Sequence, residues 1–419
     1  MDILNHSWDS MRIKHLFEER VEKNSDSKND YLSIVKDVGV IPYSEKGNVG
    51  NKTSDNPENY KRVYPDDLVI NPMNVTIGSV GISNYYGCLS NVYMVLKPKI
   101  EFHPQYYGYL FQIKSFQKSL RKISYGIMEI RESINKIEFF GLELPYPPLS
   151  EQQQIVSFLD TKTSLIDSLI EKTQRKIELL KEKRISLINE VVTKGLNPNV
   201  EMKDSGVEWI GEIPNHWIES QFKYYIKLRH GHQFRDGDFT DEGVKIIKIT
   251  QLDKGGFLNL SNCSTIDKER LTDFEDILIF ENDILMCLTG GTIGKIIKVG
   301  KVDEPLLQNY RVGHFSPIDS HSMGNNYMFY LMSSEVIIGQ IFYDVRETGQ
   351  PNIGMEDMNR MRICIPPLSE QQQMVDYLDE HTQLIDKTIS IEEKRIELLK
   401  EYRQSLISEV VTGKRKVVE

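Results

Sequence analysis

A segment of 46 residues occurs twice in this chain and constrains its fold more than any other feature. Residues 148–193 and 367–412 align without a gap, and 29 of the 46 positions are identical. A weaker match precedes each copy, where residues 67–78 align with 283–294. The chain is therefore predicted to be a tandem repeat of the form A-B-A′-B′. B and B′ are nearly the same, whereas A and A′ share a skeleton and differ in detail.

Each repeated segment is predicted to be one long helix. It runs for about 44 residues without Gly or Pro, and Ser150 with Gln153, like Ser369 with Gln372, matches a capping box at its start. Apolar residues then recur at the 3-4 spacing of a coiled-coil seam. We expect the two helices to pair antiparallel through this seam, related by a pseudo-two-fold axis. The predicted seam residues are Ile166, Ile170, Ile177, Leu180, Leu187 and Val191 in the first copy and Ile385, Ile389, Ile396, Leu399, Leu406 and Val410 in the second.

The A segments are predicted to be mixed α/β domains, because short β-branched runs alternate with Gly, Asn and Asp clusters. The clearest predicted strands are residues 244–249, 277–280, 284–288 and 295–299. Short helices are predicted at residues 106–114 and 326–334. The fold class is therefore expected to be α+β, with two mixed α/β domains separated by a pair of long antiparallel coiled-coil helices. The predicted segments are a first domain (1–147), a first repeat helix (148–194), a polar linker (195–215), a second domain (216–366), a second repeat helix (367–413) and a tail (414–419).

Composition narrows the class of protein further. A chain of 419 residues is too long for one ordinary domain. The absence of a long apolar stretch predicts no membrane span, and the start of the chain lacks the features of a secretory signal. The four cysteines lie far apart without a CxxC pair, which fits a reducing cytoplasm. The net charge of −10 argues, by itself, against a nucleic-acid binder.

Several segments resemble catalytic motifs without completing them. Thr289–Lys295 lacks the first Gly of a phosphate-binding loop and its magnesium-binding hydroxyl, and Asn71–Asn74 lacks the aromatic residue of an adenine methyltransferase motif, so both are predicted to be turns. Glu392–Lys394 has the ExK spacing of nucleases but lies on the heptad helix, which indicates an exposed helix face. His230 and His232 have no third metal ligand, so a polar loop or a nucleic-acid contact is favoured. The chain is predicted to hold no catalytic centre, metal or cofactor.

The duplicated motif Pro-Pro-Leu-Ser-Glu-Gln-Gln-Gln, with the helix that follows it, resembles the specificity subunit of type I restriction-modification systems. Val207–Trp217 is similar to the opening of a target recognition domain in that family, and the N-terminus keeps only the tail of this opening around Trp8. Gly126–Pro148 and Arg346–Pro367 resemble the end of such a domain. The resemblance spans essentially the whole chain.

This resemblance implies a non-catalytic subunit for host defence in the cytoplasm, without a membrane. Each recognition domain would read one half of an asymmetric, bipartite target in double-stranded DNA, and the helix pair would set the spacer between the halves. Two methylation subunits would dock on the repeats and bring AdoMet. Two restriction subunits, the motor-nucleases, would bring ATP and magnesium. The acidity is then explained if the methylation subunits neutralise most phosphates and this chain supplies base contacts.

Candidate DNA contacts are polar or aromatic residues in predicted loops, where an ordinary solvated role is an equal alternative for each. Thr76 and Thr292 recur in both domains, so they are also candidates for a structural role. In the first domain the candidates are Ser44, Lys46, Asn48, Lys52, Asn74, Thr76, Asn84, Tyr85 and Tyr86. In the second they are Arg229, His232, Gln233, Arg235, Lys254, Thr289, Thr292 and Lys295.

Partner docking is expected on the helix faces away from the seam and on the matching ends Glu151–Gln154 and Glu370–Gln373. A coiled-coil protein scaffold without DNA specificity is the main alternative, although it leaves the differing loop-rich domains unexplained. A fused restriction enzyme fragment requires methyltransferase or nuclease motifs. A solitary specificity subunit stays compatible with the sequence.

Overall fold

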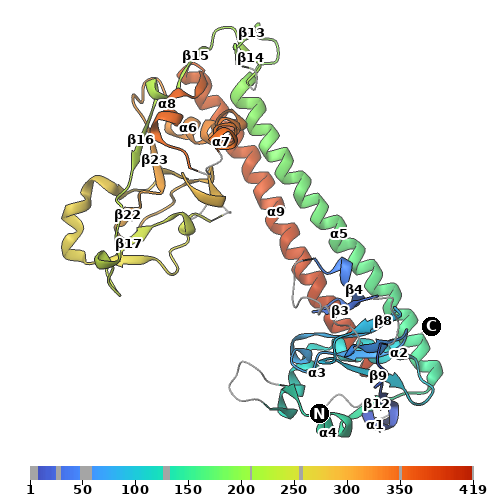
Figure 1. Cartoon of the computed structure of the whole chain (residues 1–419). Coiled ribbons are helices and arrows are strands. Elements are labelled where there is room, and N and C mark those ends of the chain that lie inside the picture. The colour runs from blue at the N-terminus through green and yellow to red at the C-terminus, as the bar shows by residue number, and fades with distance from the viewer. Residues whose placement is uncertain are drawn as a thin grey trace. The chain divides into compact units, whose positions relative to one another are not determined.

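The computed structural model describes residues 8–24, 30–47, 59–125, 133–207, 210–253, 258–348 and 352–417 (Figure 1). The chain divides into two compact units. Unit 1 joins Met1–Arg175 to Glu392–Glu419, and unit 2 is Lys176–Ile391. Each unit therefore contains one A domain together with a segment of each long helix.

The two repeats form the long helices α5 (Leu149–Lys194) and α9 (Leu368–Val411). Each ends at a glycine with positive φ, Gly195 at 72° and Gly413 at 71°, as helix C-termini favour. The predicted capping box is wrong, because each helix begins one residue before its serine. In α5 the carbonyl of Pro148 instead accepts hydrogen bonds from the N–H groups of Glu151 and Gln152, at 2.9 and 3.0 Å.

The helices pair antiparallel within each unit. In unit 1 the first half of α5 packs on the last turns of α9, and Ile166 shares a buried apolar core with Leu406 and Val410. In unit 2 the last turns of α5 pack on the first turns of α9, and Val191 shares a core with Met374. The twelve predicted seam residues are all buried or partly buried.

The centre of unit 1 is an antiparallel four-stranded sheet whose apolar face packs on α2. Phe17, Leu68 and Leu96 from the sheet are buried together with Tyr106 and Phe111 of the helix. The sheet order is β2 (Phe17–Glu19), β9 (Met94–Pro98), β6 (Leu68–Ile70), β7 (Val80–Ile82). The smaller sheets pair β1 (Asp9–Arg12) with β12 (Glu143–Tyr146), β3 (Leu32–Val35) with β4 (Gly39–Pro42), β5 (Lys61–Val63) with β8 (Gly87–Leu89), and β10 (Ser124–Tyr125) with β11 (Ser133–Ile134). The short helices are α1 (Ile13–Leu16), α2 (Pro104–Gln112), α3 (Lys114–Ser119) and α4 (Lys136–Gly141), with 3-10 turns η1 (Tyr43–Glu45), η3 (Val75–Ile77) and η4 (Leu120–Ile123).

Unit 2 repeats this plan and adds a second four-stranded sheet. The sheet equivalent to that of unit 1 has the order β16 (Ile226–His230), β23 (Val312–Pro317), β20 (Ile284–Cys287), β21 (Ile296–Lys298). The added sheet has the order β18 (Ser264–Ile266), β17 (Val244–Ile247), β22 (Leu306–Gln308), β19 (Leu278–Ile279), and only its β17–β22 pair is parallel. Two further antiparallel pairs join neighbouring strands β13 (Met202–Asp204) and β14 (Glu212–Pro214), and the first and last strands of the domain, β15 (Ile218–Gln221) and β24 (Arg362–Ile365).

The helices of unit 2 cover its first sheet. They are α6 (Asn325–Ser333), α7 (Glu335–Thr348) and α8 (Met355–Arg360), with 3-10 turns η5 (Phe222–Tyr224), η6 (Asp236–Asp238), η7 (Ile249–Gln251), η8 (Lys268–Ile277) and η9 (Gly290–Thr292). The predicted strands and helices of this domain are confirmed to within one to three residues at their ends. The glycine-rich segment Thr289–Lys295 forms the turn η9 between β20 and β21, as predicted.

The predicted fold class is confirmed. Two α+β domains with the same central strand order accompany an antiparallel helix pair. The 219-residue repeat explains this order, because equivalent segments fold in equivalent ways. Within the described ranges, no helix is both long and apolar enough to cross a bilayer.

Candidate nucleic-acid interface

Each recognition domain is tied to the start of a long helix by the same tryptophan–glutamate bond. In unit 1 the indole Nε1 of Trp8 donates to Glu151 Oε2 at 3.0 Å, and in unit 2 Trp217 donates to Glu370 at the same distance. Glu151 and Glu370 are equivalent positions of the repeat. The duplicated helix therefore offers both domains the same acceptor.

A second shared attachment joins a tyrosine of each domain to an aspartate about two and a half helical turns further along. Tyr109 of α2 donates its hydroxyl to Asp160 at 2.5 Å, and Tyr330 of α6 donates to Asp379 at 2.6 Å. Burial, and then the adjacent carboxylate, raise the pKa of both phenols above the ordinary value. The phenols are therefore neutral donors at physiological pH.

The matching helix ends, which were predicted to be docking sites, are partly occupied by hydrogen bonds within the chain. Gln152 is buried, accepts from His103 N and donates to Pro147 O, both at 2.8 Å. Its equivalent Gln371 accepts from Gly324 N at 2.9 Å. The glutamates and the first buried glutamines therefore hold the recognition domains.

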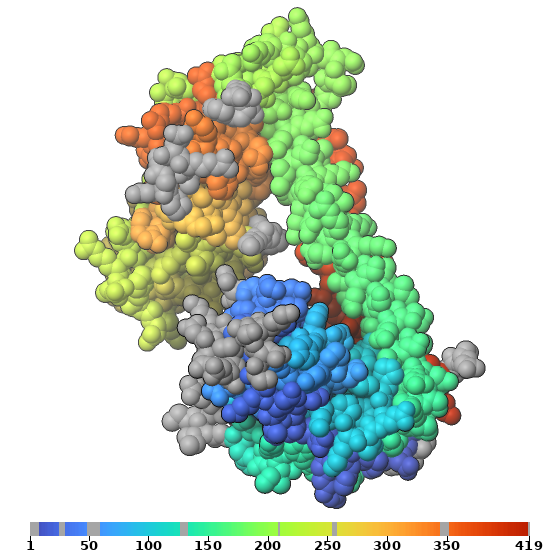
Figure 2. All heavy atoms as spheres, turned by 45° about the vertical axis from the view of Figure 1, so that its right-hand side comes forward, coloured from blue at the N-terminus to red at the C-terminus, as the bar shows by residue number. Residues whose placement is uncertain are grey.

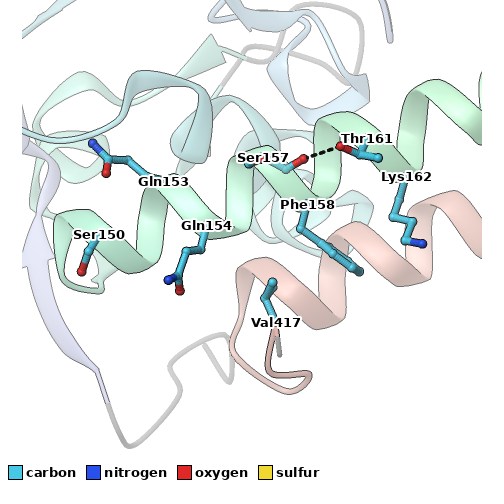
Figure 3. Close-up of a pocket in the computed structure, with 8 residues that line it drawn as sticks. All are labelled: Ser150, Gln153, Gln154, Ser157, Phe158, Thr161, Lys162 and Val417. Atoms are coloured by element: carbon cyan, nitrogen blue, oxygen red, sulfur yellow. Dashed lines mark hydrogen bonds between the residues drawn. The ribbon is translucent and has the colours of Figure 1, made fainter. Parts of the chain in front are cut away.

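Beside these anchors, the outer face of the first turns of α5 is open. A groove of 540 Å³ is lined by Ser150, Gln153, Gln154, Ser157, Phe158, Thr161, Lys162 and Val417. In Figure 3 the Phe158 ring points towards the C-terminal segment that carries Val417, and the Thr161 hydroxyl donates to Ser157 O at 2.9 Å. Gln153 and Gln154 are exposed and remain candidates for contact with another protein.

Apolar side chains also lie on the outward face of the helices. Leu165 and Leu179 of α5 are exposed, and so are their repeat equivalents Leu384 and Leu398 of α9. Figure 2 shows the outward face of α5, in green, at the surface of the molecule. Isolated exposed leucines are ordinary, but each of these leucines is exposed at the same position of both copies.

The candidates of unit 1 divide between the surface and the undescribed segments. Ser44, Asn74, Asn84, Tyr85 and Tyr86 are exposed, whereas Lys46 and Thr76 are partly buried. The Nζ of Lys46 lies 4.7 Å from the centroid of the Tyr43 ring. Asn48 and Lys52 lie outside the described residues. Asn84, Tyr85 and Tyr86 are consecutive in one loop and form the largest group of exposed candidates.

In unit 2, Arg229 occupies a structural position. Its guanidinium donates to Gln308 Oε1 at 3.1 Å, to Asp276 O at 2.8 Å and to Leu278 O at 2.9 Å. Burial lowers its pKa. Because all three nitrogens are engaged inside the domain, the geometry favours a structural role over a base contact. Lys295 likewise donates to Leu252 O.

The other candidates of unit 2 lie nearer the surface. His232, Gln233, Arg235 and Thr292 are exposed, Thr289 is partly buried, and Lys254 lies outside the described residues. The His232 ring contacts the Phe234 ring edge-on and the Phe274 ring at a tilt, with centroids 4.9 and 5.0 Å away. The imidazole is therefore held in place with its outer edge open.

Next to this loop lies a pair that the sequence reasoning missed. Tyr310 N donates to His232 O at 3.0 Å, and Arg311 Nε donates to the Tyr310 hydroxyl at 2.8 Å. Arg311 is exposed. The signal available in the sequence was a Tyr-Arg dipeptide in a connection between two strands, which is too short a pattern to distinguish from any other turn.

A second missed group lies in unit 1 around Tyr86. It consists of Arg20, Glu22, Arg62, Tyr64, Asp67 and Tyr86, and we call it the tyrosine platform. Its members come from three separate segments, so no local pattern joins them. In the part of the chain that the structure describes, no three His, Cys, Asp or Glu side chains gather as a metal site.

Comparisons with known proteins agree with this architecture. The family described as type I restriction modification DNA specificity domain matches residues 5–179 and 226–401. A type I restriction enzyme specificity subunit of Methanocaldococcus jannaschii, MjaVIII, is 30% identical over 338 residues, which cover 79% of this chain and 75% of that one. The MjaIX specificity subunit of the same organism is 25% identical over 363 residues, covering 85% and 80%.

Solved structures share the fold. One from a study of complex assembly and conformational transition of the type I R-M system has a TM-score of 0.72 at 13% identity, over 98% of this chain and 99% of that one. The HsdS subunit of Thermoanaerobacter tengcongensis has a TM-score of 0.53 at 14% identity, over 98% of both chains.

These matches define a protein with two DNA specificity domains in one chain. The chain belongs to the family of type I restriction-modification specificity subunits, as the duplicated helix motif indicated.

Proposed function

We propose that each unit recognises one half of a bipartite DNA target. The observation that carries this proposal is that the two domains share a scaffold and its attachments but differ in their exposed loops. The loop after β7 in unit 1 exposes Tyr85 and Tyr86, whereas the equivalent loop of unit 2, after β21, exposes Lys301 and Asp303. Two different readers on one scaffold suit an asymmetric target. The candidates that are exposed in the described segments remain our proposed base contacts, together with Asn48, Lys52 and Lys254, which lie outside the described residues.

The helix pair is proposed to fix the spacer between the two half-sites. A helix is stiff, and both α5 and α9 run without a break for 46 and 44 residues. The ion pair of Arg184 with Asp386, and the equivalent pair of Arg403 with Asp167, oppose sliding of one helix along the other. Because the helix pair has a constant length, it would set a constant number of unspecified base pairs between the two half-sites.

The chain is proposed to act as a non-catalytic subunit in the cytoplasm. Two methylation subunits would dock on matching outward helix faces, one around Leu165 in unit 1 and one around its repeat equivalent Leu384 in unit 2. Those subunits would bring AdoMet, and two restriction subunits would bring ATP and magnesium. Two identical surfaces suit two copies of one partner.

The net charge of −10 is compatible with this division of labour. DNA affinity that depends on salt reflects neutralised phosphates. If the methylation subunits neutralise most of them, the free chain binds DNA weakly and the complex binds with a steep salt dependence. Equal salt slopes for the free chain and the complex would contradict this view.

The decisive experiment is a methylome. This chain is co-expressed with its methylation subunit in a host without DNA methylation, and N6-methyladenine is mapped by single-molecule sequencing. The expected result is a new asymmetric motif split by a constant unspecified gap. A soluble complex that deposits no methylation would instead favour the coiled-coil scaffold or an inactive variant.

A further inference from the structure

The tyrosine platform of unit 1 starts from a buried ion pair. Arg20 donates to both carboxylate oxygens of Asp67, at 2.8 and 2.9 Å, and Asp67 is 1% exposed. The same carboxylate accepts from Tyr64 N at 2.9 Å. The Arg20 guanidinium therefore lies fixed over the Tyr64 ring, 4.3 Å from its centroid.

The second ring of the platform is held in the same manner. Tyr86 meets the Tyr64 ring edge-on at 5.2 Å, and the guanidinium of Arg62 lies 5.1 Å from the Tyr86 centroid. Arg62 is 2% exposed, whereas Tyr86 is 45% exposed. Two guanidinium groups thus support two rings, one of which presents about half of its surface to solvent. Ordering of these rings costs little on binding, because contacts inside the domain already fix them.

The charges around the tyrosine platform determine which part of the DNA it can contact. Glu22 accepts from the Tyr64 hydroxyl at 3.0 Å, lies 3.7 Å from Arg20, and its side chain is 49% exposed. The carboxylates of Glu22 and Asp67 offset the charge of Arg20. An exposed carboxylate repels phosphate but accepts hydrogen bonds from base amino groups, and an aromatic ring makes apolar contact with the methyl group of thymine in the major groove.

Resting on the proposed function, we propose that the tyrosine platform contacts bases, and not phosphates, of the half-site that unit 1 reads. The exposed Tyr86 ring packs against the methyl group of a thymine in the groove. The Glu22 carboxylate selects a base that presents an amino group in the groove.

Unit 2 carries the same turn without the platform. Tyr64–Asp67 and Phe280–Asp283 are equivalent turns, in which Phe280 N donates to Asp283 Oδ2 at 2.8 Å. The third residues, Asp66 and Asn282, have φ of 71° and 70°. Phe280 is 60% exposed, but in the described part of unit 2 no cation lies over its ring.

The equivalent arginine of unit 2 forms different contacts. Arg229, the strand equivalent of Arg20, bonds inward to Gln308 and to backbone carbonyls. The platform therefore distinguishes the first domain from the second on a common scaffold, as a residue group that sets different half-sites must do.

The test compares Tyr86→Ala with the native chain in the complete methylation complex. The native methylome first gives the motif, and binding is then measured on a duplex with that motif over a range of salt concentrations. Tyr86→Ala is expected to lower the affinity between about 5-fold and about 150-fold, as loss of one base contact does, with an unchanged salt slope. Its methylome should lose selectivity in one half-site only. Tyr86→Phe keeps the ring and should preserve both readouts.

Tyr125→Ala is the matched control, because Tyr125 is an exposed tyrosine of the same domain that bonds to Glu138 outside the platform. It should change neither the motif nor the affinity. If Tyr86→Ala is insoluble, Glu22→Gln replaces it and should relax one half-site at a single position. An unchanged motif and affinity, or a shallower salt slope, overturns the proposal. A native complex that deposits no split motif contradicts the proposed function itself.

Discussion

Arg184 of α5 forms an ion pair with Asp386 of α9, and its Nε lies 3.0 and 3.2 Å from the two carboxylate oxygens. The equivalent pair in unit 1 joins Arg403 to Asp167, at 2.9 and 3.3 Å. Because the two pairs occupy equivalent positions of the repeat, α5 and α9 pair in the same register in each unit. The arginines, which interrupt the seam in the sequence, therefore contact the partner helix as well as solvent.

Charge exchange across one of these pairs should restore what a single change removes. Arg184→Asp alone places two carboxylates together and should destabilise unit 2, whereas Arg184→Asp with Asp386→Arg should recover most of the loss. Because the pair is partly exposed, its coupling energy should be only about 0.2–1 kcal/mol. A double-mutant cycle by thermal denaturation measures it. Coupling near zero would show that the pair does not support the register.

Loss of a domain anchor should have a larger effect. Tyr330→Phe removes the donor to Asp379 and should lower the stability of unit 2 by about 1–2 kcal/mol, since hydrogen bonds to charged groups exceed neutral ones. Tyr109→Phe should do the same in unit 1. Hydrogen exchange locates each effect, and the exposed Tyr125→Phe serves as the control with little change. Equal exchange in native and variant chains would contradict the anchoring role.

The same phenols predict a pH dependence. The pKa of Tyr109 and of Tyr330 is raised in the folded chain, so the folded state holds these protons more tightly than the unfolded one. Their contribution to stability is fully present below the ordinary phenol pKa of about 10 and is lost as the pH rises above it. Unfolding free energies measured from pH 8 upward should therefore fall less steeply above pH 10 for the double Tyr→Phe variant. Identical slopes would refute this.

The outward leucines should control partner stoichiometry. Leu165→Glu with Leu384→Glu should prevent docking of the methylation subunits, because a charge would be buried in the contact. The free chain should keep its stability, since both leucines are exposed. Native mass spectrometry of reconstituted complexes counts the bound subunits. Either single substitution should remove one copy, and full occupancy of the double variant would place docking elsewhere.

The spacer should follow the helix length. A heptad inserted after Thr173 and another after the equivalent Glu392 lengthen both helices by about 10 Å while they keep the pairing of Arg184 with Asp386. At about 3.4 Å per base pair, the unspecified gap of the methylated motif should grow by roughly three base pairs. The same insertion in α5 alone shifts the register and should prevent soluble expression. A methylated motif with its original gap would contradict the proposal that the helix pair fixes the spacer length.

The long helices could be predicted almost completely, because their information is local. A gap-free repeat, seven-residue spacing and terminal glycines define α5, α9 and their seam without reference to the rest of the chain. Only their first residues differed, where Pro148 displaced the predicted serine cap. The two matching domains also followed from the repeat, since equivalent sequences fold alike.

The interface residues depended on contacts that no local pattern contains. Arg229 is a residue type that often contacts DNA. Its side chain instead points into the domain, because it bonds to Asp276 and Gln308, which lie 47 and 79 positions away in the sequence. Tyr86 became part of a platform only when Arg20 and Arg62 folded beneath the rings. The sequence alone determined the helices, the duplication and the family, because their signals are periodic. The tertiary structure decided which polar side chains face solvent, because that depends on distant segments competing for the same hydrogen-bonding groups.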